Sequence, residues 1–220
     1  MIRIFDLILS GIGLLVLLPI LSPVCVVLRF TGEGEIFYKQ ERVGLNGKTF
    51  KLLKFATMLK NSPKLGAGEI TIKDDPRVLP IGKFLRKSKI NELPQLWNIF
   101  VGEMSIVGPR PLVEKTYRKY SEKVKFSISK VRPGLTGIGS IVFRDEEKLL
   151  NNLEDPILFY DTHISPYKGE LEIWFVENNS LSVYFKIIFL TAWVIIFPSS
   201  KIVGRQFPSI PPLPDFINPQ

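Results

Sequence analysis

The stretch from residue 89 to residue 97 carries the side chains best suited to chemistry. Asn91 and Glu92 stand side by side just before Pro94, and the apolar residues that follow recur at helical spacing. Pro94 suits the first turn of a helix, so the pattern predicts a short helix with Asn91 as its N-cap. The start of such a helix attracts phosphate, and a basic run lies just upstream. A capped surface helix with a solvated basic run explains the same residues, so the spacing leaves both interpretations open.

Two arginines are presented by rigid segments. Arg110 lies between two prolines in Gly108-Pro109-Arg110-Pro111, and Arg132 precedes Pro133-Gly134, with Thr136 shortly after. A guanidinium group on a fixed turn is suited to binding phosphate oxygens. Lys54, in a predicted strand, is a further candidate. Each residue also has a structural interpretation, either as a surface charge or as an arginine paired with a carboxylate.

The composition limits the kinds of site that the chain can build. The protein has 220 residues, a formal net charge of +8, one cysteine and one histidine. The single cysteine excludes an internal disulfide, and one histidine excludes a histidine-rich metal site. Any metal is therefore expected to be a hard cation held by oxygen, such as Mg²⁺, with help from substrate phosphates. The positive charge favours anionic partners, but no recognition helix or stacking platform supports nucleic acid as one of them.

The first apolar segment predicts a membrane element. Residues 7 to 28 form an uncharged segment that is long enough to span a bilayer. Arg3 and Arg29 flank this segment. Pro19 and Pro23 predict a break or kink, and the Ser22 hydroxyl can bond to a carbonyl one turn earlier. Basic residues at both ends favour a cytoplasmic position for both ends, and a break halfway makes a re-entrant hairpin possible. A kinked spanning helix fits the same pattern.

The remaining elements should form a mainly α fold with a small β-hairpin. The hairpin is expected from two semi-alternating runs joined through Asn46-Gly47. Residues 112 to 126 predict a charged amphipathic helix, and residues 181 to 198 predict an interfacial helix. The proline-rich tail should be extended and lack a core of its own. The predicted domains are a membrane segment (1–31), a membrane-surface catalytic domain (32–198) and the C-terminal tail (199–220).

Up to about Pro198, the chain resembles the bacterial sugar transferase family, in particular its small monotopic phosphoglycosyl transferases. Several short motifs carry this resemblance, and their order and spacing make the set specific. They are Phe5-Asp6, Ser22-Pro23, Lys54-Phe55, Thr57-Met58, Asp75-Pro76-Arg77, Glu92-Leu93-Pro94-Gln95, Gly108-Pro109-Arg110-Pro111 and Arg132-Pro133-Gly134 with Thr136-Gly137.

The resemblance implies an activity, a location and partners. It implies transfer of a sugar-1-phosphate from a UDP-sugar to a polyprenyl (undecaprenyl) phosphate, with release of UMP and initiation of a surface glycan. It also implies a re-entrant helix, broken at Ser22-Pro23 and in contact with membrane lipid, and an active site on the cytoplasmic face of the bacterial inner membrane. Mg²⁺ is the implied cofactor. The sequence leaves open a homodimer and the identity of the sugar.

The same resemblance assigns roles to individual residues. Asn91 and Glu92 take the positions of the catalytic and magnesium-binding pair, and Arg86 that of a phosphate-binding arginine. Lys54 and Arg110 match positions expected near the diphosphate. Arg132 and Thr136 are assigned to the nucleotide end.

The chain departs from the family pattern at its most important position. The family has an aspartate nucleophile where this chain has Asn91, and a neutral amide is a poor nucleophile toward phosphorus. Three hypotheses follow. Glu92 could act as the nucleophile; the polyprenyl phosphate could attack directly; or the chain could be an inactive membrane scaffold that binds a nucleotide sugar or partner enzymes.

Overall fold

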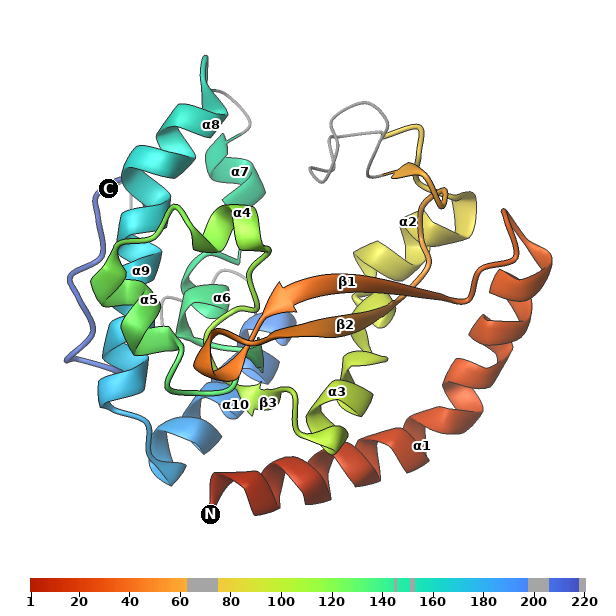
Figure 1. Cartoon of the computed structure of the whole chain (residues 1–220), viewed down its shortest axis with the longest axis horizontal. Helices are drawn as coiled ribbons and strands as arrows, with labels where there is room; N and C mark the ends of the chain where they lie inside the picture. Colours follow the sequence, from red (N-terminus) through yellow and green to blue (C-terminus); the bar gives the residue numbers. More distant parts are fainter. Residues whose placement is uncertain (63–74, 145, 151–152, 198–205, 218–220) are drawn as a thin grey trace. The chain divides into compact units, whose positions relative to one another are not determined.

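The computed structural model describes residues 1–62, 75–144, 146–150, 153–197 and 206–217. The chain forms two compact units. We call Phe5–Glu41 with Lys51–Gly102 the N-terminal unit. Met1–Ile4, Arg42–Phe50 and Glu103–Gln220 form the C-terminal unit. The predicted class is confirmed: most elements are helices, and a two-stranded hairpin is present (Figure 1).

Helix α1 (Ile2–Phe30) contains both prolines of the first apolar segment. The helix stays continuous, and its ribbon bends along its length (Figure 1). Ser22 Oγ donates to Pro19 O at 3.3 Å, as the sequence predicted. Among the described residues, α1 is the one helix with the length and apolar composition needed to cross a membrane. It therefore supports membrane association, and both the re-entrant and the spanning arrangement remain compatible with its composition.

The hairpin consists of β1 (Phe37–Val43) and β2 (Thr49–Phe55). A short 3₁₀ turn, η1 (Leu45–Gly47), joins the two strands. Asn46 and Gly47 have φ angles of 57° and 72°, the left-handed conformation that the Asn-Gly pair supplies in hairpin connections. The predicted hairpin is confirmed, and the Asn-Gly pair forms its turn as expected.

In the N-terminal unit, Leu28, Phe55 and Leu85 form a buried apolar cluster. Leu85 belongs to α2 (Pro80–Lys87), which is followed by the 3₁₀ turn η3 (Ile90–Glu92) and by α3 (Gln95–Val101). These bounds show that the N-cap prediction for Asn91 was wrong. Asn91 lies inside η3, and Pro94 is the N-cap of α3. A separate 3₁₀ turn takes up residues 90–92, so the α-helix begins only after the proline.

The C-terminal unit contains a two-stranded parallel sheet that the sequence did not predict. Strand β3 (Ser105–Val107) pairs with β4 (Gly134–Thr136), with Ser105 opposite Gly134 and Val107 opposite Thr136. Each strand has three residues, which is too short to show a pattern of alternation.

Helices make up most of the C-terminal unit. In chain order they are α4 (Glu114–Tyr117), α5 (Glu122–Ile128), α6 (Ile138–Val142), α7 (Glu146–Leu150), α8 (Pro156–Phe159), the π-helical turn η4 (Tyr160–Ile164), α9 (Ser165–Glu177) and α10 (Leu181–Ile196). The single helix predicted over residues 112–126 is instead two short ones. Ser121 has an extended backbone and accepts the Val124 N–H, which starts α5 as a separate helix.

Helix α10 occupies the segment predicted as an interfacial helix. Its buried face carries Tyr184, Ile187, Leu190 and Val194 at helical spacing. Other large apolar side chains of α10 remain exposed, among them Phe185, Phe189, Ile195 and Ile196. This arrangement leaves an apolar face available, as the interfacial interpretation requires.

The described part of the C-terminal tail packs against α9 and the segment before it. Phe207 is only 4% exposed, and its ring contacts Trp174 edge to face at a centroid distance of 5.3 Å. Tyr167 Oη donates to Pro211 O at 2.8 Å, and Phe216 packs edge to face on Phe159. The tail was expected to have no core of its own, and the structure adds that it contributes Phe207 to the core of this unit.

We expect Phe207→Ala to lower the free energy of unfolding by about 3 kcal/mol, because it removes a buried aromatic side chain and leaves a cavity beside Trp174. Urea unfolding in detergent micelles measures this change. Gln206→Ala, at the exposed neighbouring position, is the matched control and should change stability by less than about 0.5 kcal/mol. Equal stability of the two variants would show that the tail is not packed as described.

Candidate active site

An ion pair joins two of the predicted site residues in the N-terminal unit. Lys54 Nζ on β2 lies 3.0 Å from Glu92 Oε1 at the end of η3. Their side chains are 19% and 23% exposed, so the pair is partly screened from water while still open to a ligand. Partial burial strengthens the electrostatic interactions of both groups, so that Lys54 attracts an anion and Glu92 attracts a cation more strongly than either would in water. The sequence placed both residues in the site, and the structure brings them into contact.

Asn91 has a buried side-chain oxygen that accepts no hydrogen bond from the described residues. The residue is 7% exposed, and its Oδ1 has no hydrogen-bond partner in the part of the chain that the structure describes. Leaving a buried acceptor unsatisfied costs about 1–3 kcal/mol, which a bound ligand could recover. Lys89, two residues before Asn91, has a φ angle of 60°, an uncommon conformation for a non-glycine residue that is often found at functional sites.

Asn98 was not among the predicted site residues, although it holds the site together. Its Oδ1 accepts the Leu53 N–H at 2.9 Å, and its Nδ2 donates to Lys51 O at 2.9 Å. The side-chain amide therefore pairs with the edge of β2 next to Lys54, which attaches α3 to that strand. The available signal was a polar residue in the middle of an apolar run, between Leu96-Trp97 and Ile99-Phe100. Such residues are often buried only when both ends of the amide are satisfied.

Arg86 lies near the end of α2 in the same unit. Its Nη1 is 3.8 Å from Met58 Sδ. Helix α2 packs closely on the chain that leaves β2, because a Cβ atom at Gly82 would come within 2.2 Å of Thr57 O. Only glycine allows this approach, so Gly82 fixes the helix that carries Arg86.

In the C-terminal unit, the two arginine-bearing turns lie side by side. Gly108 N–H donates to Thr136 O at 2.9 Å, and Gly134 N–H donates to Pro109 O at 2.8 Å. A Cβ atom at Gly108 would lie 2.4 Å from Arg132 O, so the backbones touch without a side chain between them. The sequence treated the two turns as separate features, and the structure joins them.

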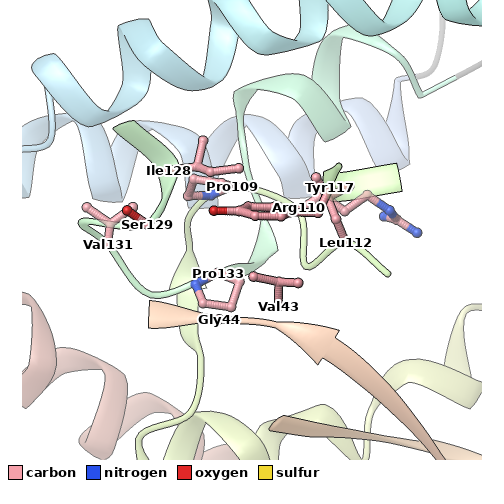
Figure 2. Close-up of a pocket in the computed structure, with 10 residues that line it drawn as sticks. All are labelled: Val43, Gly44, Pro109, Arg110, Leu112, Tyr117, Ile128, Ser129, Val131 and Pro133. Atoms are coloured by element: carbon pink, nitrogen blue, oxygen red, sulfur yellow. The ribbon is translucent and has the colours of Figure 1, made fainter. Parts of the chain in front are cut away.

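Arg110 is exposed at the tip of its turn. A small pocket lies beside the turn, lined mainly by apolar groups from the end of β1, from Tyr117 and from residues 128–133. Figure 2 shows the Arg110 guanidinium directed away from the other residues that line this pocket. Arg110 therefore presents its charge toward solvent, where a phosphate can reach it.

Arg132 and Thr136 are more enclosed. The Thr136 hydroxyl lies 2.8 Å from Thr191 Oγ1 on α10, and Thr191 in turn donates to Ile187 O. Thr136 therefore has a structural partner in addition to the nucleotide-binding role predicted for it. Arg132 is half-buried at the start of the second turn.

A buried carboxylate, Glu172 on α9, lies behind the Arg110 turn. Burial raises the pKa of Glu172 to about 7, although the backbone N–H of Arg110 and the charges of Lys168 and Arg110 act in the opposite direction. Burial also lowers the pKa of Lys168, which forms an ion pair with Glu146. The sequence analysis did not single out Glu172, because nothing in its neighbouring residues indicates that it faces inward among charged groups.

The residues around Asn91 are compatible with magnesium. The unpartnered Asn91 Oδ1 and the Glu92 carboxylate are oxygen groups of the kind that Mg²⁺ prefers. The described residues contain no cluster of three or more histidine, cysteine, aspartate or glutamate side chains that could hold a metal. A magnesium ion would therefore need phosphate oxygens of the substrate to complete its coordination.

Comparisons with known proteins agree with the sequence motifs. The family model described as bacterial sugar transferase matches residues 1–198. The chain is 37% identical over 203 residues to the exopolysaccharide production protein ExoY of Sinorhizobium fredii, covering 86% of this chain and 82% of that protein.

Two further relatives carry names that state a reaction. The chain is 32% identical over 191 residues to the UDP-glucose:undecaprenyl-phosphate glucose-1-phosphate transferase of Escherichia coli K12, covering 86% of this chain and 38% of the relative. It is 30% identical over 211 residues to the undecaprenyl-phosphate galactose phosphotransferase of Salmonella typhimurium. That match covers 88% of this chain and 40% of the relative. The chain thus spans most of ExoY but well under half of these two larger relatives.

The raised pKa of Glu172 makes a prediction about stability. The folded protein holds this proton up to about pH 7, whereas the unfolded chain loses it near pH 4.5, so Glu172 costs stability as the pH rises between these values. Glu172→Gln removes the titration. We expect the free energy of unfolding of this variant, relative to the unchanged protein, to increase by about 3 kcal/mol between pH 4 and pH 8.5.

Denaturant unfolding at several pH values measures this difference. Glu170→Gln, at an exposed carboxylate on the same helix, is the matched control for the substitution itself. A stability difference between Glu172→Gln and the unchanged protein that stays constant with pH would contradict the burial of an ionisable Glu172.

Proposed function

Because this chain belongs to the bacterial sugar transferase family, we propose that it transfers a sugar-1-phosphate from a UDP-sugar to a polyprenyl phosphate and releases UMP. The observation that carries the proposal is the match of the family model across residues 1–198, combined with a cationic and oxygen-rich site at the matching motif. The names of two relatives state transfer of a sugar phosphate to undecaprenyl phosphate. ExoY of Sinorhizobium fredii, 82% of which is covered by the match, is named for exopolysaccharide production.

The membrane helix provides the place where the two substrates meet. Helix α1 keeps only three of its residues buried in the protein (Asp6, Ser10 and Leu28), so most of its apolar surface is available to lipid. A re-entrant helix bent near Ser22-Pro23 would hold the polyprenyl chain in one leaflet and its phosphate at the surface. The basic flanks Arg3 and Arg29 favour a cytoplasmic position for both ends at the bacterial inner membrane, where UDP-sugars are available.

The described side chains suit phosphate transfer through positioning and charge. Lys54 and Arg110 match family positions expected near the diphosphate and are proposed for that role, and Arg86 is proposed as a phosphate-binding arginine. Arg132 and Thr136 are assigned to the nucleotide end. Phosphate transfer needs little covalent help from a protein once its reactants are aligned and their charge is compensated.

Direct transfer fits the substitution at residue 91. Glu92 could form a covalent intermediate, but its Oε1 is held 3.0 Å from the Lys54 ammonium, which reduces its nucleophilicity. In the direct reaction, a polyprenyl phosphate oxygen attacks the phosphorus that carries the sugar. The bond from that phosphorus to the bridging oxygen breaks, and the oxygen leaves with UMP. The product is a polyprenyl diphosphate sugar.

Asn91 and Glu92 are the residues proposed to hold magnesium. When bound, the ion would supply charge neutralisation at the diphosphate. The Lys54 ammonium compensates charge from the protein side, and the Asn91 amide binds without adding negative charge that would repel an incoming phosphate.

The same asparagine favours a second candidate function. A chain that keeps the fold and the cationic site but lacks the family's carboxylate could bind a nucleotide sugar, or a partner enzyme, without turnover. In that case the protein would act as a membrane scaffold, and UDP-sugars would bind without release of UMP.

Purified protein in nanodiscs, supplied with Mg²⁺, polyprenyl phosphate and a panel of UDP-sugars, should release UMP. We expect Glu92→Ala to reduce the rate by about 100-fold, because it removes the partner of Lys54 and a proposed magnesium ligand. Glu122→Ala, at an exposed carboxylate, is the matched control and should retain the activity. Activity that appears only in Asn91→Asp would instead identify the unchanged chain as a scaffold.

Omitting the acceptor separates direct from covalent transfer. With UDP-sugar and Mg²⁺ but no polyprenyl phosphate, the unchanged protein should release no UMP, because direct attack needs the acceptor. Asn91→Asp should release about one equivalent of UMP per protein, because an aspartate can form a phosphosugar ester first. A rapid burst of UMP from the unchanged protein would contradict direct transfer and identify Glu92 as the nucleophile.

A further inference from the structure

The backbone of the Arg110 turn is held at successive points. Pro109 O accepts the Gly134 N–H at 2.8 Å, and Pro111 O accepts from Arg42 Nη1 at 3.1 Å. Proline has no backbone N–H, so the only backbone donor within Pro109-Arg110-Pro111 is that of Arg110. The partner of this one donor therefore decides whether the turn is fully fixed.

That partner is the Glu172 carboxylate, which accepts the Arg110 N–H. Glu172 is 6% exposed, and its Oε2 has no hydrogen-bond partner among the described residues, so the bond falls to Oε1. A Cβ atom at Gly139 on α6 would lie 2.8 Å from Oε1. Glycine at residue 139 therefore leaves room for the carboxylate to reach the turn.

A buried carboxylate is a costly way to fill this position. An apolar side chain of similar size would avoid the desolvation penalty, and such replacements of buried charges are often neutral or stabilising. Two cations, Lys168 on α9 and the Arg110 guanidinium, only partly compensate the negative charge of Glu172. The other ionisable groups nearby are Glu146 on α7 and the Tyr120 and Tyr160 hydroxyls, which add no positive charge. A stabilising role alone does not explain Glu172.

We propose that Glu172 is a positioning residue, which fixes the backbone of Arg110 so that its guanidinium is presented to the diphosphate of the nucleotide sugar. The diphosphate role of Arg110 rests on the function proposed above. Glu172 itself is buried behind the turn and acts through Arg110. A preorganised arginine binds with less loss of conformational freedom, so the contribution of Glu172 should appear in nucleotide affinity.

Two substitutions separate the acceptor from the charge. Glu172→Leu removes the acceptor, and Glu172→Gln keeps an acceptor oxygen without the charge. We expect Glu172→Leu to weaken UDP binding, measured by calorimetry in nanodiscs at pH 8, and to raise the KM for the UDP-sugar, each by about tenfold. Glu172→Gln should stay within about threefold of the unchanged protein.

The Arg110→Ala variant tests whether the effect passes through the arginine. The double variant Arg110→Ala with Glu172→Leu should bind UDP no more weakly than Arg110→Ala alone, because the positioning contribution is already lost. Unchanged UDP affinity in Glu172→Leu, or losses that multiply in the double variant, would overturn the inference. An unchanged protein that neither binds UDP nor releases UMP would overturn the proposed function instead.

A measurement on the hydrogen bond itself needs neither activity nor the leucine variant. Labelling with proline carbonyl ¹³C and arginine ¹⁵N selects two amide signals, those of Arg77 and Arg110, because Pro-Arg occurs twice in the sequence. The Arg110 signal should shift with a midpoint near pH 7. Glu172→Gln should abolish that shift and leave the Arg77 signal unchanged. An Arg110 signal that is insensitive to Glu172→Gln would refute the contact.

Discussion

The structure depends on how it treats polar groups that are removed from water. An unsatisfied buried donor or acceptor costs about 1–3 kcal/mol, so a charged substrate site can be built only if its supporting groups are paired. Asn98 satisfies the edge of β2 with both ends of its amide, and Glu172 accepts the N–H of Arg110. Asn91 Oδ1 is left without a partner among the described residues, at the position where a ligand is proposed to bind.

The same constraint explains the glycines of the C-terminal unit. Gly108 and Gly134 lie where two turns exchange backbone hydrogen bonds, and a Cβ atom at either would come within 2.4 Å of a backbone atom. The close approach joins the Arg110 and Arg132 turns through backbone atoms alone. A turn held in this way presents Arg110 at the surface, and the Glu172 carboxylate completes its support by accepting the Arg110 N–H.

Asparagine at residue 91 shapes the proposed chemistry. It keeps an oxygen that can ligate magnesium but lacks the carboxylate that the resemblance leads us to expect at this position, while the neighbouring Glu92 is paired with Lys54. Direct attack by the acceptor phosphate requires only alignment and charge compensation, which the described cations can supply. This one residue therefore separates a direct transferase from a binding scaffold, although the fold around it belongs to the family.

The sequence by itself determined the features that depend on neighbouring residues. These are the apolar helix with its Ser22 hydroxyl bond, the hairpin at Asn46-Gly47, and the ordered motifs that identified the family. Tertiary structure decided the rest. It moved Asn91 from a helix cap into a buried 3₁₀ turn, joined the two arginine turns through a short parallel sheet, and turned Glu172 inward onto Arg110. These features arise from contacts between residues far apart in the chain, for which local periodicity and turn chemistry carry no signal.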